Sequence, residues 1–260
     1  MTSIPATFLK ETVCPVCNLQ FKVEAVRTSK IRVLETYDDF GRKYSSDVNP
    51  ILYSSWTCPK CLYSANSGDN YALPVIPELK VFILKHYKTL KRMSGDFDFY
   101  EPRTPEMAIK SLILSSLCYR IKRNSRGIMA ACYMRVCWIM RNEQRDIKEE
   151  LPFLKKAYNC YVHALTKEYS PNFGKISEYG IYYIIGLLAY KLGNLEKAKD
   201  YLSKVIMNKK KVETFILNSA SILYDDLKNL KTIPKDDIEL DLDLEIDEAE
   251  WIKDLDLTLD

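Results

Sequence analysis

Two short cysteine motifs constrain the fold of this chain more than any other feature. They are Cys14-Pro15-Val16-Cys17 and Cys58-Pro59-Lys60-Cys61. Two residues between cysteines let the chain fold back so that both sulfurs reach one ion, and four thiolates complete a tetrahedral shell. The proline after each first cysteine sets a backbone angle that suits this turn. We therefore predict that Cys14, Cys17, Cys58 and Cys61 bind one Zn²⁺ ion.

The expected zinc site is structural, because a shell of four protein ligands leaves no open position for a substrate. Iron in a rubredoxin-like site is a minor alternative, since tetrahedral sulfur suits both metals. A dithiol oxidoreductase is a further alternative, because Cys-x-x-Cys turns also lower the thiol pKa. A thioredoxin-like site, however, has a single such motif that opens a helix, whereas this chain has two motifs among expected strands.

The remaining cysteines lie among apolar residues at helical spacing, which favours buried free thiols that act as small hydrophobic side chains. They are Cys118, Cys132, Cys137 and Cys160. No secretory signal is visible at the N-terminus, and a reducing compartment disfavours disulfides. We therefore expect a cytoplasmic protein with reduced cysteines.

The cysteine motifs belong to an expected small zinc ribbon that covers residues 1–76. Apolar and polar residues alternate over Phe21–Val26 and Ile31–Thr36, and Pro50–Thr57 leads into the second motif, so these segments are expected as strands. Forty residues separate the two motifs, more than in common ribbons. The interval includes an insertion at residues 37–49. It is either a loop with a binding role or a longer hairpin whose aromatic residues cover a small core.

The pattern changes to a helical one at Pro77, and residues 77–232 are expected to form a helical domain. Apolar residues recur there at steps of three and four. Thr104 followed by Pro105 marks one helix start, and Gly193 marks a helix end. The expected helices cover Glu78–Met93, Pro105–Arg123, Ile128–Arg145, Ile147–Glu168, Ile176–Lys191, Leu195–Met207 and Val212–Leu230. The fold class is therefore predicted as α+β, mainly α.

Two of the expected helix pairs resemble tetratricopeptide repeats. The positions that match the repeat are Tyr182, Ile185, Gly186, Ala189 and Gly193. The small residue Gly186 lets the paired helix approach closely, with Ala198 as its partner across the contact. We therefore expect a tetratricopeptide-like stack of helical hairpins, for which a generic α-helical bundle is the alternative.

Residues 233–260 form an acidic tail that we expect to be disordered. From Lys235 to Asp260 there are twelve Asp or Glu residues and two Lys, a balance of −10, so the rest of the chain carries 36 basic and 23 acidic residues, or +13. Residues 238–247 alternate apolar and acidic side chains without a break. This charge asymmetry suggests that the tail can dock on the basic body, in cis or from a second copy.

The sequence offers no catalytic constellation, and we expect no enzyme activity. The two histidines, His86 and His163, lie far apart without metal-ligand spacing, and the eight glycines form no phosphate-binding loop. No apolar run approaches the length of a membrane span. The preferred function is a protein-interaction module in which the helical stack binds a peptide or protein partner, with a basic surface favouring an acidic one.

Clusters of basic residues leave a nucleic-acid-binding regulator as the alternative function. Lysines and arginines gather in the ribbon and on several expected helices, and aromatic residues stand in the insertion. Such surfaces bind single-stranded nucleic acid through phosphate contacts and base stacking. Basic residues are also common on solvated helix faces, so the charge pattern alone does not select this function.

Several spaced motifs resemble one known bacterial family. They are Cys14-Pro15-Val16-Cys17, Phe21-Lys22, Arg27-x-Ser29-Lys30-x-Arg32, Asp38-x-Phe40, Asn49-Pro50, Trp56-Thr57-Cys58-Pro59-Lys60-Cys61-x-Tyr63-x-Ala65 and Tyr182-Tyr183-Ile184-Ile185-Gly186 with Leu192-Gly193 and Ala198. This set is similar to the family catalogued as domain of unknown function 2225, over most of Phe8–Asn208. The resemblance implies a cytoplasmic bacterial protein with a metal-binding ribbon and tetratricopeptide-like helices, and it brings no known activity. Leu62 departs from the family pattern, which usually has Gly there, so the turn after Cys61 is expected to be less tight.

Overall fold

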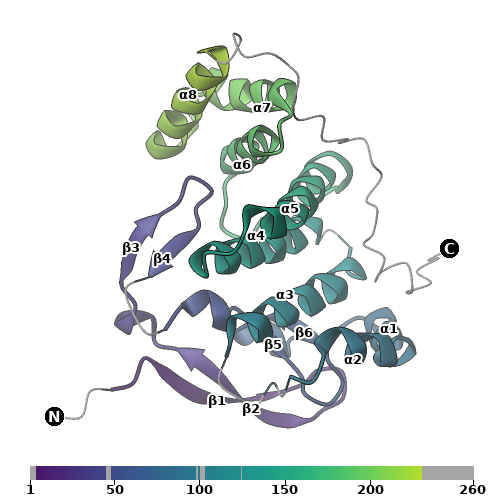
Figure 1. The fold of residues 1–260 in the computed structure, drawn as a ribbon. Helices are drawn as coiled ribbons and strands as arrows, with labels where there is room; N and C mark the ends of the chain where they lie inside the picture. The colour runs from purple at the N-terminus through teal and green to yellow at the C-terminus, as the bar shows by residue number, and fades with distance from the viewer. Residues whose placement is uncertain (1–3, 45–47, 98, 100–102, 124, 230–260) are drawn as a thin grey trace.

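The computed structural model describes residues 4–44, 48–97, 99, 103–123 and 125–229. Small antiparallel strand pairs occupy the N-terminal part and helices form the rest (Figure 1). The predicted class, α+β and mainly α, is confirmed. Within the described ranges, no helix has the length and apolarity needed to cross a membrane. The acidic tail, residues 233–260, lies outside the described residues.

The strands form three separate antiparallel pairs. The pairs are β1 (Thr7–Val13) with β2 (Gln20–Val26), β3 (Val33–Thr36) with β4 (Arg42–Tyr44), and β5 (Ser55–Thr57) with β6 (Ser64–Asn66). The strand expected over Pro50–Thr57 is extended only at its end, since Pro50–Tyr53 forms a 3₁₀ turn. Asn49 explains the difference, because its side chain accepts a hydrogen bond from the Ile51 amide at 3.0 Å and starts the turn.

The helices follow the predicted pattern with one exception. They are α1 (Pro77–Lys85), α2 (Tyr87–Ser94), α3 (Pro105–Arg120), α4 (Arg126–Asn142), α5 (Ile147–Lys167), α6 (Glu178–Lys191), α7 (Leu195–Met207) and α8 (Thr214–Asn229). The single helix expected over Glu78–Met93 is wrong, because the backbone of His86, at φ −104° and ψ 14°, separates α1 from α2. Thr104 caps α3 as predicted and accepts a hydrogen bond from the Met107 amide at 3.2 Å.

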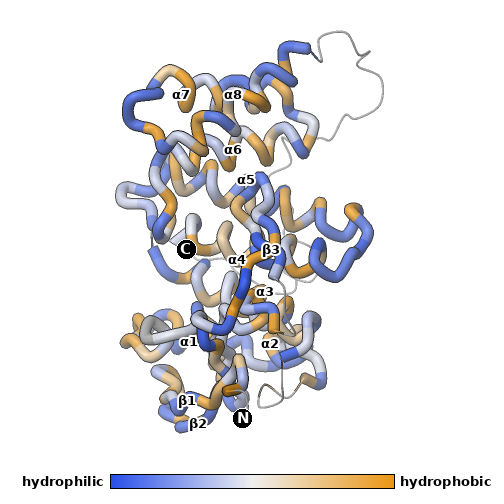
Figure 2. Tube along the Cα trace, turned by 90° about the vertical axis from the view of Figure 1, so that its left-hand side faces the viewer, coloured by the Kyte–Doolittle hydropathy of each residue, from blue (hydrophilic) through white to orange (hydrophobic). Residues whose placement is uncertain are grey.

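The helices from α3 onward stack one on the next along the length of the molecule (Figures 1 and 2). Gly186 of α6 faces α7, as predicted, since a Cβ there would lie 2.9 Å from Leu202 Cγ and 3.4 Å from the Ala198 carbonyl oxygen. Gly193 follows α6 with φ 81°, a conformation that costs glycine little. The assignment of these hairpins as tetratricopeptide-like repeats stays a prediction.

One continuous cluster of buried side chains runs from Cys14 to Leu227 and so includes residues on both sides of position 76. The division at residue 76 stays a prediction. Where the β5–β6 hairpin meets α3, small hydroxyl side chains line the contact. Ser55 Oγ lies 2.6 Å from Ser115 Oγ, and Thr57 Oγ1 lies 2.8 Å from Ser111 Oγ. These short side chains let the second cysteine motif pack closely on the helical half while their polar atoms stay hydrogen-bonded.

Candidate metal centre

Each cysteine motif forms the turn of its own β-hairpin, and the two turns have the same backbone hydrogen bonds. In the β1–β2 hairpin, the Cys14 amide donates to the Leu19 carbonyl at 2.9 Å, and the Asn18 amide donates to the Cys14 carbonyl at 2.9 Å. In the β5–β6 hairpin, the Cys58 amide donates to the Tyr63 carbonyl at 2.8 Å, and the Leu62 amide donates to the Cys58 carbonyl at 2.9 Å. The expectation of a looser second turn was therefore wrong.

The four sulfur atoms converge between the two hairpins. Cys14 Sγ lies 3.5 Å from Cys61 Sγ, and Cys17 Sγ lies 3.6 Å from Cys58 Sγ. All four sulfurs lie within 4.8 Å of one another. Four thiolates bound tetrahedrally to zinc at about 2.3 Å are about 3.8 Å apart. The predicted ligand residues are thus brought together with spacings that fit one metal ion.

Burial and proton sharing characterise the sulfur cluster. Cys14, Cys58 and Cys61 are buried, and Cys17 is partly exposed. Hydrogen bonds from the Cys58 and Cys61 thiols lower the pKa of Cys14, and the interaction with Cys14 raises the pKa of Cys58. Cys14 therefore loses its proton readily, and Cys58 then retains its own proton. Binding of a divalent cation would release the remaining protons and hold all four sulfurs as thiolates.

Aromatic side chains pack beneath the cluster around Tyr71. Its ring centroid lies 5.2 Å from that of Tyr63, 5.7 Å from that of Trp56 and 6.0 Å from that of Phe21. Burial raises the pKa of both Tyr63 and Tyr71. The sequence interpretation did not include Tyr71, which follows the second hairpin. These rings give the two cysteine turns a common apolar base.

The comparisons with known proteins agree with the sequence resemblance. The bacterial family described as "Uncharacterized protein conserved in bacteria (DUF2225)" matches residues 7–227. The chain belongs to the DUF2225 family. It is 27% identical over 265 residues to an "Uncharacterized protein" from Borreliella burgdorferi (strain ATCC 35210 / DSM 4680 / CIP 102532 / B31), an alignment that covers 86% of this chain and 94% of that protein. No solved structure matches the chain.

In this DUF2225 chain the histidines lie apart from the cysteine cluster. The His86 ring packs on Phe82 with centroids 4.8 Å apart. Burial and the nearby Arg126 lower the pKa of His163 on α5. Neither histidine belongs to the group of four metal-binding candidates.

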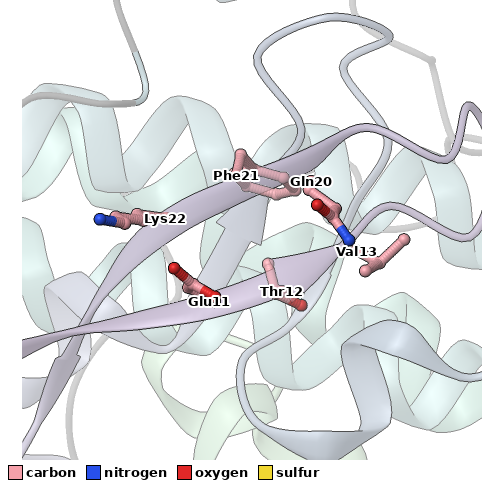
Figure 3. A pocket seen from close by; sticks show the side chains of 6 residues that line it. All are labelled: Glu11, Thr12, Val13, Gln20, Phe21 and Lys22. Carbon is pink, nitrogen blue, oxygen red and sulfur yellow. The ribbon is translucent and has the colours of Figure 1, made fainter.

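A shallow depression lies on the β1–β2 hairpin of the DUF2225 chain, beside the first cysteine turn. Its volume is about 260 Å³, and its lining consists of Glu11, Thr12, Val13, Gln20, Phe21 and Lys22 (Figure 3). Glu11 and Lys22 are paired across the strands.

The insertion at residues 37–49 includes the turn between β3 and β4, and this turn is anchored in the helical half. The Asp39 carboxylate is fully buried and accepts hydrogen bonds from Trp138 Nε1 and the Arg141 guanidinium, each at 3.0 Å. Arg141 also pairs with the buried Glu150. These carboxylates raise the pKa of Arg141 despite its burial. A Cβ at Gly41 would lie 2.5 Å from the Trp138 ring, so this position admits only glycine without rearrangement.

Further contacts hold the same turn against α6 and α8. The Tyr183 hydroxyl donates to the Asp38 carbonyl at 3.0 Å, and Lys191 Nζ lies 2.9 Å from the Asp38 carboxylate. The Phe40 ring lies 5.6 Å from the Tyr183 ring and 5.8 Å from the Phe215 ring. The insertion is thus a hairpin with a packed aromatic residue, as one of the two alternatives stated, but its contacts are with the helical stack. We call residues 37–41 the hairpin tip.

Proposed function

We propose that this DUF2225 protein is a non-enzymatic interaction module with a structural Zn²⁺ site, acting in the bacterial cytoplasm. The zinc part is supported by four convergent thiols, which are soft ligands that suit zinc and can fill a tetrahedral shell. With the shell filled by protein, the ion joins two hairpins and offers no position to a substrate. Its role is then to hold the β1–β2 hairpin on the β5–β6 hairpin, which packs on α3.

The non-enzymatic part of this proposal is supported by the raised pKa values of the cysteines outside the metal site. Burial raises the pKa of Cys118 to about 12 and the pKa values of Cys132 and Cys160 to about 11. A thiol with such a pKa is a poor nucleophile near neutral pH, because the thiolate is the reactive form. These cysteines fill space in the core of the helical half instead.

The partner-binding part rests on one observation, which is the way the helices already bind the hairpin tip. Arg141 and Lys191 pair with the two aspartates of the tip, Tyr183 donates to its backbone, and an aromatic contact holds Phe40. The stack thereby recognises a short acidic and aromatic segment of its own chain. The proposed tetratricopeptide-like hairpins α4–α5 and α6–α7 would present the remaining helical surface to a peptide or protein partner of similar acidic character.

Two measurements test this function. Metal analysis of the full chain, purified without chelators, should give one zinc per chain and no iron; a chain that folds without stoichiometric metal would overturn the zinc part. For partner binding, tagged full-length protein should capture a partner from the native bacterium, and this capture should weaken in Lys197→Glu, which reverses an exposed charge on α7. Lys30→Ala in the ribbon is the control. Capture that is equal in both variants would contradict binding by the helical stack.

A further inference from the structure

The first helix exposes apolar side chains to solvent at one end of the molecule. In α1, Leu84 is 73% exposed and Val81 is 62% exposed, while Leu79 and Ile83 on the opposite face are fully buried. Further exposed apolar residues flank the helix in the sequence on both sides. Together they form what we call the α1 stripe: Leu73, Ile76, Val81, Leu84 and Tyr87. Exposed apolar residues concentrated in this way mark an interaction surface.

The α1 stripe lies in a basic setting. At about 100° per residue, Lys80 and Lys85 stand about 70° to either side of the line through Val81 and Leu84. Residues 77–94 contain five basic side chains and one acidic side chain, Glu78. Within the described part of the chain, neither Lys80 nor Lys85 makes an ion pair. An occupant that places apolar groups on the stripe and carboxylates beside it would complement both features.

The chain itself contains a segment with this chemistry. Residues 238–247 read Ile-Glu-Leu-Asp-Leu-Asp-Leu-Glu-Ile-Asp. In an extended backbone, alternate side chains point to opposite sides, so five apolar side chains share one side and five carboxylates the other. The long stems of Lys80 and Lys85 can cover apolar surface while their amines reach the carboxylates.

The position of α8 decides which copy supplies the segment. The stripe lies at the end of the stack opposite α7 and α8 (Figures 1 and 2). Both views place the helices from α2 to α8 one after another along the stack, and the path through α3, α4, α5 and α6 has five steps of about 9 Å, so about 45 Å of stack separates α2 from α8. From Asn229 to Ile238 an extended chain spans about 30 Å at most. The first apolar residue of the segment therefore cannot reach the stripe of its own molecule.

We propose that residues 238–247 of a second copy of this chain dock on the α1 stripe, so that the protein self-associates through its acidic tail. This surface is separate from the helical hairpins of the proposed function, and the inference does not depend on them. The contact combines apolar burial with charge attraction, so association should weaken as salt rises. If two copies exchange tails, the contact is made twice and closes a symmetric dimer.

Sedimentation equilibrium of the full-length chain at low and high salt tests the proposal. We expect reversible self-association that weakens with salt. The stripe variant Val81→Asp/Leu84→Asp should weaken it about tenfold or more, because two apolar contacts are lost and two like charges face the tail. The tail variant Glu239→Gln/Asp241→Asn/Asp243→Asn/Glu245→Gln should also weaken it. Ile147→Asp changes an apolar residue of α5 that is 57% exposed; it is the control and should have no effect.

A mixing experiment shows whether the two surfaces meet. The stripe variant retains a native tail and the tail variant retains a native stripe, so an equimolar mixture should associate although each variant alone does not. This result also excludes misfolding as the cause of the losses. A chain that stays monomeric at all concentrations, a mixture that fails to associate, or stripe-dependent binding to phosphatidylglycerol vesicles in place of self-association would each overturn the proposal.

Discussion

Asn18 and Leu62 occupy the same position in the two cysteine turns, and both adopt a left-handed backbone, with φ 57° and φ 65°. Each donates its amide to the carbonyl of the first cysteine of its motif. Asn tolerates this conformation, whereas a branched aliphatic residue is strained by about 1–2 kcal/mol. Leu62 is only 2% exposed, so burial of its side chain offsets the strain.

The exposed Asn18 allows the backbone requirement to be tested without a change in packing. Asn18→Gly should leave the free energy of unfolding unchanged or slightly increased, because glycine adopts positive φ freely. Asn18→Val should lower it by about 1–2 kcal/mol, because a β-branched residue is strained there. Urea denaturation of the metal-loaded protein measures both. Equal stability of the two variants would show that the left-handed turn does not constrain this position.

Removal of a metal ligand should be far more costly than removal of another buried cysteine. Cys58→Ser is expected to abolish stoichiometric zinc and to lower the free energy of unfolding by several kcal/mol, because metal binding energy contributes directly to folding. Cys132→Ala, equally buried on α4, is the control and should cost about 1 kcal/mol with zinc retained. Metal analysis and urea denaturation check the pair. Retained zinc in Cys58→Ser would contradict the four-ligand site.

The cysteine centre could be predicted because its information is local. Cys-Pro-x-Cys spacing determines a turn within four residues, and two copies are enough to imply a shared ion. Helix α7 was predicted at its observed limits, because three- and four-residue spacing is a strong signal. Strands β1, β4 and β6 were not predicted. Strands β4 and β6 have three residues each and depend on their partner strands for stability.

The role of the insertion could not be predicted from the sequence. Asp39 lies 99 residues from Trp138 and 102 residues from Arg141, and nothing in the spacing indicates that they meet. The only local signal was an acidic and aromatic turn followed by Gly41. Its close packing against Trp138 is a consequence of tertiary structure. The hydrogen-bonded contact of Ser55 in β5 with Ser111 and Ser115 in α3 was not predicted for the same reason, because these residues are also far apart in the sequence.

The buried thiols of the helical half should make the protein less stable at alkaline pH. Burial raises the pKa of Cys132 to about 11 and that of Cys118 to about 12, from an ordinary value of 9.0. The folded state therefore keeps protons that the unfolded state releases, and this contribution to stability is lost as pH rises from about 9 through 11 and 12. The free energy of unfolding should fall less steeply over this range in Cys132→Ala than in the wild type. Identical slopes would contradict the raised pKa.

The buried carboxylate of the hairpin tip should contribute much more to stability than its exposed neighbour. Asp39→Asn removes the charged partner that is fully buried, while Arg141 keeps its pair with Glu150, and this change should cost about 1.5–3 kcal/mol. Asp38→Asn removes the ion pair with Lys191, in which the Asp38 side chain is 49% exposed, and should cost less than about 1 kcal/mol. Urea denaturation compares the two variants. Equal effects of the two substitutions would show that the buried ion pair of Asp39 stabilises the hairpin tip no more than the exposed ion pair of Asp38.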